Sequence, residues 1–189
     1  MNGKTKFGIV LPNWDWDTHQ WGSNLEGGKP VSYEALKSFA LTCERLGYHS
    51  ILINDHLIRG KGGYILEGWT ALASLASITR RIRLGHLVLC NTFRYPQVLA
   101  KMASTLDMIS NGRLEFGIGA GWMREEHFQY GIPFPEAKLR VEHLDEAVEV
   151  IRRLWTEKRA TFNGHYYRIN DAVCEPKPVQ KPRPPICIG

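Results

Sequence analysis

The feature that most constrains the fold is a regular alternation of short apolar runs with longer amphipathic segments. The apolar runs predict strands at residues 7–11, 50–54, 82–89 and 114–119. Apolar side chains at helical spacing predict helices at residues 32–47, 67–79, 96–109 and 137–155. Such alternation implies parallel strands joined by right-handed crossovers. The chain is therefore of the α/β class, as either a doubly wound sheet or a (β/α)₈ barrel.

The length of the chain bears on the choice between these two folds. A (β/α)₈ barrel takes at least about 200 residues and has eight strands. This chain has 189 residues, and its fifth predicted strand starts at residues 185–189. An apolar parallel strand at that point would leave an open sheet edge, which is prone to aggregation. We therefore expect residues 1–189 to be a single (β/α)₈ TIM barrel domain, incomplete at its C-terminus.

Three further segments interrupt the alternation. Residues 14–30 are rich in tryptophan, glycine and asparagine, and a loop of this length is typical of a lid or binding loop. Residues 161–169 predict a hairpin around Asn163-Gly164, because Asn-Gly is the strongest short hairpin signal. Residues 174–185 form a proline-rich linker before the fifth strand.

Charge and cysteine usage exclude several classes of protein. The net charge is +5, but the basic residues are scattered, so we expect a small-molecule substrate and no nucleic acid. No apolar run approaches the roughly 20 residues that span a bilayer. The first strand begins too early for a signal peptide. The cysteines contain no CxxC pair, which fits reduced thiols in the cytoplasm; they are Cys43, Cys90, Cys174 and Cys187.

Polar residues follow the predicted strands at their carboxyl ends. In both α/β architectures, ligands bind at this end of the strands. A purely structural sheet has no need of polar or glycine-rich sequence at each of these positions, so we predict a ligand site there. The strand ends carry Asn13, Asp55-His56, Cys90-Asn91 and Gly119-Ala120-Gly121-Trp122.

His56 is the best candidate for catalysis, because an imidazole donates or accepts a proton near neutral pH. Asp55 either fixes the tautomer of His56 or caps the loop. Asn91 offers a donor and an acceptor at once, which suits a planar heterocycle with an imide-like edge. Cys90 either contacts a ligand or is simply buried.

Three glycines at alternate positions lead into Trp122. Glycine inside a strand marks a close approach to the backbone, and glycine after a strand permits a tight turn with positive φ. A flat ligand against the strand end accounts for both features, and a turn packed on a neighbouring helix is the alternative. The run is not a dinucleotide fingerprint, since G-x-G-x-x-G would need glycine where Trp122 stands. NAD is not expected by this route.

The spacing of the other histidines predicts no metal site. None of them forms a pair or cluster with metal-ligand spacing. We interpret them as structural or surface residues. They are His19, His49, His86, His127, His143 and His165.

Four stretches together resemble the luciferase-like monooxygenase family, in particular its deazaflavin (coenzyme F420)-dependent branch. The likeness covers nearly the whole chain. The combination is specific, although each piece alone is only moderately so. The stretches are Arg113–Trp122, Asn54-Asp-His-Leu57, Leu99–Ser110 and Cys174–Ile186.

The resemblance implies a (β/α)₈ barrel about twice as long as this chain, with reduced FMN or the deazaflavin at its mouth. It would place the ring near His56, Cys90, Asn91 and residues 119–121. It also implies a non-prolyl cis peptide near residues 89–91, a bond that costs about 3–4 kcal/mol. The family's phosphate-binding residues lie in later strands.

One position departs from the family pattern. Sugar-phosphate dehydrogenase members carry an acid in the strand-four turn region, whereas this sequence has Trp122. Glu125 or Glu126, in the following polar helix at residues 123–130, are the acids nearest to that position. The departure puts sugar phosphate in doubt as the substrate.

The sequence therefore predicts an F420- or FMN-dependent oxidoreductase, with F420 preferred and His56 as the catalytic residue. The expected cofactor contacts are Asn13, Asp55, Cys90, Asn91, Gly119, Ala120, Gly121 and Trp122. We expect a homodimer for the full-length protein. A two-component monooxygenase that uses FMNH₂ and O₂ and a non-catalytic cofactor-binding barrel remain alternatives.

Overall fold

The computed structural model describes residues 5–14, 31–59 and 61–189. The expected lid spans residues 14–30, of which residues 15–30, including Trp16 and Trp21, lie outside the described residues. The chain forms two compact units, Met1–Leu87 and Val88–Gly189. No helix in the described part of the chain is long and apolar enough to cross a membrane.

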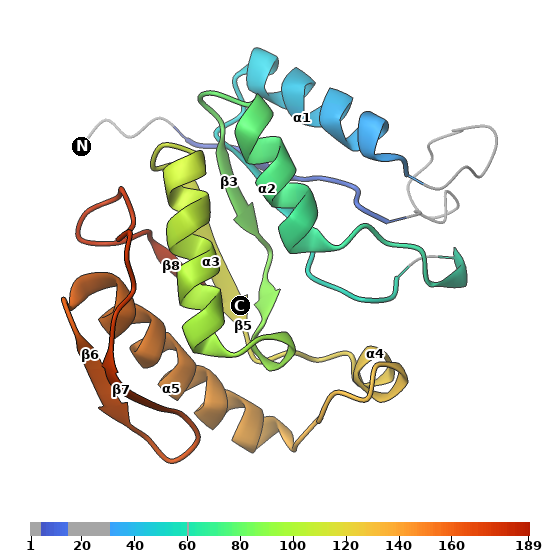
Figure 1. Ribbon diagram of the computed structural model, residues 1–189. Coiled ribbons are helices and arrows are strands. Elements are labelled where there is room, and N and C mark those ends of the chain that lie inside the picture. The colour runs from blue at the N-terminus through green and yellow to red at the C-terminus, as the bar shows by residue number, and fades with distance from the viewer. Residues whose placement is uncertain (1–4, 15–30, 60) are drawn as a thin grey trace. The chain divides into compact units, whose positions relative to one another are not determined.

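The first unit is built on three parallel strands with β2 in the middle. Ile51 and Ile53 of β2 are fully buried, as expected for a central parallel strand. Helices α1 and α2 pack on each other (Figure 1). The elements are β1 (Gly8–Val10), α1 (Tyr33–Leu46), β2 (Ser50–Ile53), the 3₁₀ turn η1 (Lys61–Gly63), α2 (Gly68–Ile78) and β3 (Arg83–His86).

Both helices of this unit begin and end at the residues that the sequence predicts. Ser32 Oγ accepts a hydrogen bond from the Ala35 N–H at 3.1 Å, which is a standard N-cap. Gly47 ends α1 in the left-handed conformation with φ 82°. The carboxylate of Glu67 caps α2 by accepting from the N–H groups of Trp69 and Thr70.

The first strand is less buried than predicted. Phe7 is 66% exposed, and Leu46 of the predicted apolar stripe of α1 is 67% exposed. Both side chains line a surface hollow of about 1050 Å³ beside the amino end of β1. Parallel α/β proteins bind ligands at the opposite, carboxyl end of their strands, so we do not assign this hollow to the predicted site.

The second unit is built on three parallel strands with β5 in the middle. The predicted strand at residues 82–89 is therefore two strands, because β3 ends at His86 and β4 begins at Leu89. The fifth predicted strand is present and pairs with β5. The elements are β4 (Leu89–Cys90), the 3₁₀ turn η2 (Asn91–Phe93), α3 (Pro96–Ile109), β5 (Leu114–Gly119), α4 (Arg124–Gln129), α5 (Ala137–Thr156), β6 (Ala160–Asn163), β7 (Arg168–Ala172) and β8 (Ile186–Ile188).

Helices α3 and α5 lie side by side in this unit (Figure 1). The Trp155 ring meets Phe116 of β5 edge-on, with centroids 5.1 Å apart. Its indole N–H donates to the Ala100 carbonyl at 2.9 Å, so a large buried ring also satisfies its one polar group. Ile109 of α3 and Val141 of α5 are each 51% exposed.

The predicted hairpin is confirmed, with β6 and β7 antiparallel. Its loop spans residues 164–167, because the Gly164 N–H bonds to the Tyr167 carbonyl at 3.0 Å. The Glu146 carboxylate on α5 accepts from the N–H groups of His165, Tyr166 and Tyr167 at 2.6, 2.8 and 3.0 Å. One carboxylate therefore holds the whole loop against α5.

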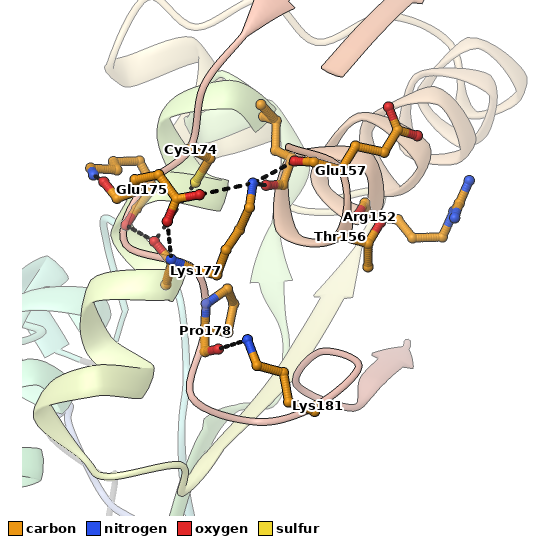
Figure 2. A network of polar contacts seen from close by, with 11 residues as sticks. Arg152, Thr156, Glu157, Cys174, Glu175, Lys177, Pro178 and Lys181 are labelled. Carbon is orange, nitrogen blue, oxygen red and sulfur yellow. Dashed lines mark hydrogen bonds and ion pairs between the residues drawn. The ribbon is translucent and has the colours of Figure 1, made fainter. Parts of the chain in front are cut away.

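Lys177 joins the proline-rich linker to the end of α5. Its ammonium donates to the carbonyls of Leu154 at 2.8 Å and Glu157 at 2.5 Å (Figure 2). These groups belong to the last helical turn, where cations are favoured. Lys101 of α3 donates to the Glu175 carbonyl, so the linker is bound to both helices.

The non-prolyl cis peptide that the family resemblance implied near residues 89–91 is absent. The cis bonds in the described part of the chain are Glu175-Pro176 and Lys181-Pro182. Proline greatly reduces the cost of a cis bond, whereas other residues need a compensating interaction of about 3–4 kcal/mol. The end of β4 is reached with trans peptides instead.

Candidate functional site

At the end of β1, the Asn13 side chain is part of the framework of the first unit. Its Nδ2 donates to the carbonyls of Asn54 at 3.1 Å and Leu66 at 3.0 Å. The side chain is fully buried, and its Oδ1 has no hydrogen-bond partner among the described residues. The amide nitrogen of Asn13 thus serves to hold the backbone of the first unit.

The pair Asp55-His56 directly follows β2, as predicted. Asp55 is 4% exposed, whereas His56 is partly exposed. Gly68, the first residue of α2, lies so close to the Asn54 carbonyl that a Cβ would collide with it. The start of α2 therefore braces the end of β2, and His56 emerges from a rigid support.

At the end of β4, Asn91 is only 1% exposed. Its Nδ2 lies 3.5 Å from the Tyr167 hydroxyl, at the limit of a hydrogen bond, and its Oδ1 has no partner among the described residues. Burial raises the pKa of the Tyr167 phenol, so the hydroxyl keeps its proton. Sequence reasoning missed Tyr167, because it lies 76 residues from Asn91 and no local pattern signals the contact.

The glycine turn after β5 is close-packed against other residues of its own unit. A Cβ on Gly119 would lie 2.9 Å from Val88 Cγ2 and 3.0 Å from the Gly189 carbonyl oxygen. Gly121 has φ +82°, and its Cβ would lie 2.7 Å from Cys90 Sγ. Packing thus requires glycine at both positions, and the Trp122 side chain is 65% exposed.

Arg140 of α5 also holds the glycine turn. Its Nε donates to the Gly121 carbonyl at 3.2 Å, and its Nη1 donates to the Pro135 carbonyl at 2.6 Å. The guanidinium lies over the Phe134 ring, 4.0 Å from the centroid. Arg140 was not predicted as a site residue, since a single arginine in an amphipathic helix gives no distinctive signal.

His127 was interpreted as structural or surface, and it is fully buried. Its Nε2 lies 2.6 Å from Thr92 Oγ1, which in turn lies 3.0 Å from Cys90 Sγ. Cys90 is 7% exposed. The structure thus adds Thr92 and His127 to the predicted residues at the end of β4.

The acids near Trp122 differ in burial. Glu125 is exposed, whereas Glu126 is 1% exposed. In the described residues, no three histidine, cysteine, aspartate or glutamate side chains form a group that could hold a metal ion.

The second unit offers a group that fits a flavin or deazaflavin ring. The ring system carries an imide N–H beside carbonyl oxygens, and a buried amide oxygen needs a donor of that kind. Asn91 Oδ1 is such an acceptor. Asn91 can therefore fill its predicted role, while close packing is one reason for glycine at positions 119 and 121.

Comparison with known proteins gives relatives of two kinds. Over 165 residues the chain is 39% identical to an F420-dependent glucose-6-phosphate dehydrogenase of Intrasporangium calvum, covering 85% of this chain and 48% of that protein. Over 167 residues it is 35% identical to the pyrimidine monooxygenase RutA of Variovorax paradoxus, covering 84% and 44%. The chain thus spans about half the length of the curated relatives that it matches.

The fold agrees with a solved structure. The monooxygenase RslO1 of Streptomyces bottropensis superimposes with a TM-score of 0.77 at 29% identity, covering 97% of this chain and 53% of that one. This confirms the predicted fold class, an α/β fold of the (β/α)₈ barrel type of which the chain represents about half. The sequence profile of the luciferase-like monooxygenases matches residues 5–189. The chain therefore belongs to the luciferase-like monooxygenase family.

Proposed function

We propose that the protein is an oxidoreductase that uses coenzyme F420 or FMN, with F420 preferred, and acts on a small organic substrate. The observation that carries the proposal is the buried amide of Asn91, whose oxygen lacks a donor in the described part of the chain. Support comes from a 39% identical relative that is an F420-dependent dehydrogenase. When bound, the cofactor supplies hydride transfer.

Individual residues are proposed for separate tasks. Asn91 accepts a hydrogen bond from the imide N–H of the ring. His56 takes or gives the substrate's proton at an imidazole nitrogen, while Asp55 orients the ring of His56. Cys90 and residues 119–122 are proposed as further ring contacts, and the unpartnered oxygen of Asn13 is proposed as an acceptor.

The larger context of the chain is also a proposal. We infer that residues 1–189 belong to one barrel domain of a longer protein, which dimerises and works in the cytoplasm. The proposal draws on the length of the relatives, about twice that of the matched region. Wide cysteine spacing without CxxC pairs supports a reducing compartment.

Titration with oxidised F420 or FMN tests the proposal, with absorbance and fluorescence as readouts. We expect saturable spectral change with the wild-type protein and at least about tenfold weaker binding for Asn91→Ala, since a buried acceptor bond is lost. Asn163→Ala, at an exposed position on β6, is the matched control. No spectral change with either cofactor would refute the proposal.

His56→Ala separates an enzyme from a cofactor-binding protein without turnover. The change should leave the affinity for F420 within about twofold and reduce hydride transfer between the cofactor and an active substrate by at least about a hundredfold. Unchanged turnover in His56→Ala would remove His56 from the chemistry. The substrate screen begins with small alcohols and sugar phosphates.

A monooxygenase is the second candidate. The chain is 35% identical to a pyrimidine monooxygenase, and the structural neighbour RslO1 is also a monooxygenase. The two candidates differ in their need for oxygen. Turnover that depends on reduced FMN and consumes O₂ in proportion to product would favour the monooxygenase, whereas turnover under nitrogen with F420 favours the dehydrogenase.

A further inference from the structure

The second unit contains a chain of three hydrogen-bonding side chains at the end of β4, in which Cys90 and His127 are buried and Thr92 is half-buried. Cys90 Sγ lies 3.0 Å from Thr92 Oγ1, and that oxygen lies 2.6 Å from His127 Nε2. The sulfur is also 3.9 Å from the same nitrogen. On the far side of the ring, His127 Nδ1 lies 2.8 Å from the Met123 carbonyl oxygen.

Elementary hydrogen-bond chemistry fixes the direction of this chain. A carbonyl oxygen only accepts, so His127 Nδ1 carries the hydrogen, and Nε2 of the neutral ring is an acceptor. The Thr92 hydroxyl therefore donates to Nε2. Its oxygen is left to accept from the Cys90 S–H. Each donor in the chain thus points toward the imidazole.

The surroundings hold the chain in this arrangement. The rings of Phe93 and Phe134 cover the imidazole, with centroids 5.1 and 4.6 Å from its own. Gly121 leaves room for the sulfur, since a Cβ there would lie 2.7 Å from it. The imidazole is fully buried, and Thr92 Oγ1 lies within hydrogen-bond distance of its Nε2.

We propose that Cys90, Thr92 and His127 form a proton relay. The S–H bond of Cys90 breaks and its proton passes to Thr92 Oγ1, while the hydroxyl proton of Thr92 passes to His127 Nε2. The products are a thiolate and an imidazolium, with no net change in charge. If the proposed oxidoreductase function holds, the relay supplies a proton-transferring group in addition to His56.

Charged groups around the relay come from α4 and α5. Arg124 and Arg140 lie over the Phe134 ring, 5.4 and 4.0 Å from its centroid. Glu126 of α4 is also buried. Charges of both signs therefore accompany the proposed pair.

Alkylation of the 189-residue chain by iodoacetamide between about pH 5 and pH 9 tests the relay, because only the thiolate reacts. Peptide-resolved mass spectrometry follows Cys90 separately from the exposed Cys187. We expect the wild-type rate at Cys90 to rise at lower pH than the rate at Cys187. Near pH 6.5, Thr92→Val and His127→Gln should each slow Cys90 at least about tenfold.

The conservative variants separate the relay from a merely structural role. Thr92→Ser keeps the hydroxyl and should retain the wild-type profile. His127→Gln keeps an acceptor near the position of Nε2 but cannot take a proton. Thr105→Val, at an exposed position on α3, is the control for loss of a hydroxyl. If Thr92→Val does not fold, the alkylation profile of His127→Gln compared with that of the wild type tests the relay.

A wild-type pH profile in His127→Gln, or equal profiles for Cys90 and Cys187, would overturn the relay. The measurement is made without cofactor, so it is independent of the proposed function. A chain that shows the expected profile but binds neither F420 nor FMN retains the relay and loses the proposed function. Cofactor binding together with equal alkylation profiles at Cys90 and Cys187 would retain the proposed function and overturn the relay.

Discussion

The strand ends of the two units carry polar side chains that are held in different ways. In the first unit, the amide of Asn13 donates to two main-chain carbonyls, at Asn54 and Leu66. In the second unit, Cys90, Thr92 and His127 bond chiefly to one another. The first arrangement cannot change without loss of structure, whereas the second can exchange protons while the backbone stays in place.

The largest effect is expected from Asn13→Asp, which keeps the shape of the side chain but removes its donor. A carboxylate would face two carbonyl oxygens in a fully buried position. We expect a loss of about 3–5 kcal/mol in the free energy of unfolding at pH 7. Burial raises the pKa of the new carboxyl in the folded state, so the loss should shrink as the pH falls.

Urea denaturation at pH 7 and pH 4 measures this loss, with Asn170→Asp on exposed β7 as the control. The control should change the free energy of unfolding by less than about 0.5 kcal/mol. An Asn13→Asp loss as small as that of the control would mean that the end of β2 does not depend on the amide. The comparison between the two strand ends would then fail.

A second contrast is between Gly121→Ala and Gly131→Ala. Both glycines have positive φ, at 82° and 65°, so each alanine costs about 1–2 kcal/mol in backbone strain. A Cβ at Gly131 meets nothing within 4 Å, whereas at Gly121 it lies 2.7 Å from Cys90 Sγ. Gly121→Ala should therefore cost about 1–3 kcal/mol more, through overpacking.

Thermal unfolding of the two alanine variants, together with the alkylation rate at Cys90, measures this contrast. The added methyl should displace the sulfur and alter its reactivity in Gly121→Ala alone. Equal melting temperatures and equal rates would show that the glycine turn does not set the position of Cys90.

Thr92→Val should have a smaller effect on stability than either of these changes. The free energy of unfolding should fall by about 1 kcal/mol, the net value of a typical hydrogen bond. Urea denaturation beside Thr105→Val gives the measurement. A loss above about 3 kcal/mol would show that Thr92, like Asn13, is a structural residue, because a loss of that size requires a large packing or burial defect.

The smallest effect on stability is expected from a change at Glu149 on α5. Hydrogen bonds from the guanidinium of Arg152, and then of Arg153, hold the pKa of Glu149 at about 2, against an ordinary value of 4.5. Because the side chain is 31% exposed, solvent screening limits the gain, and Glu149→Gln should cost only about 0.5–1 kcal/mol at pH 7.

The sign of the pH effect follows from the lowered pKa of Glu149. Its contribution to stability is fully present above about pH 4.5 and is lost as the pH falls toward 2. The difference in unfolding free energy between wild type and Glu149→Gln should therefore vanish in strong acid. Glu34→Gln, whose side chain is 75% exposed, is the control and should show almost no difference at any pH. A difference that grows in acid would contradict the assignment.

Local signals account for most of the predicted elements. Ser32, Gly47 and Pro96 mark helix ends in the sequence and in the structure, because caps and prolines act on their immediate neighbours. Burial was predicted less well. Phe7 and Val141 fit an apolar pattern but are more than half exposed, since a periodic pattern does not show which neighbours cover a face.

The sequence by itself determined the alternating α/β class, the family and the placement of His56, Cys90 and Asn91 at the carboxyl ends of strands. These follow from patterns that extend over only a few residues each. Tertiary structure alone decided that His127 meets Thr92, 35 residues away, and that Tyr167 meets Asn91, 76 residues away. Contacts at such separations depend on how whole elements pack, which no local pattern encodes.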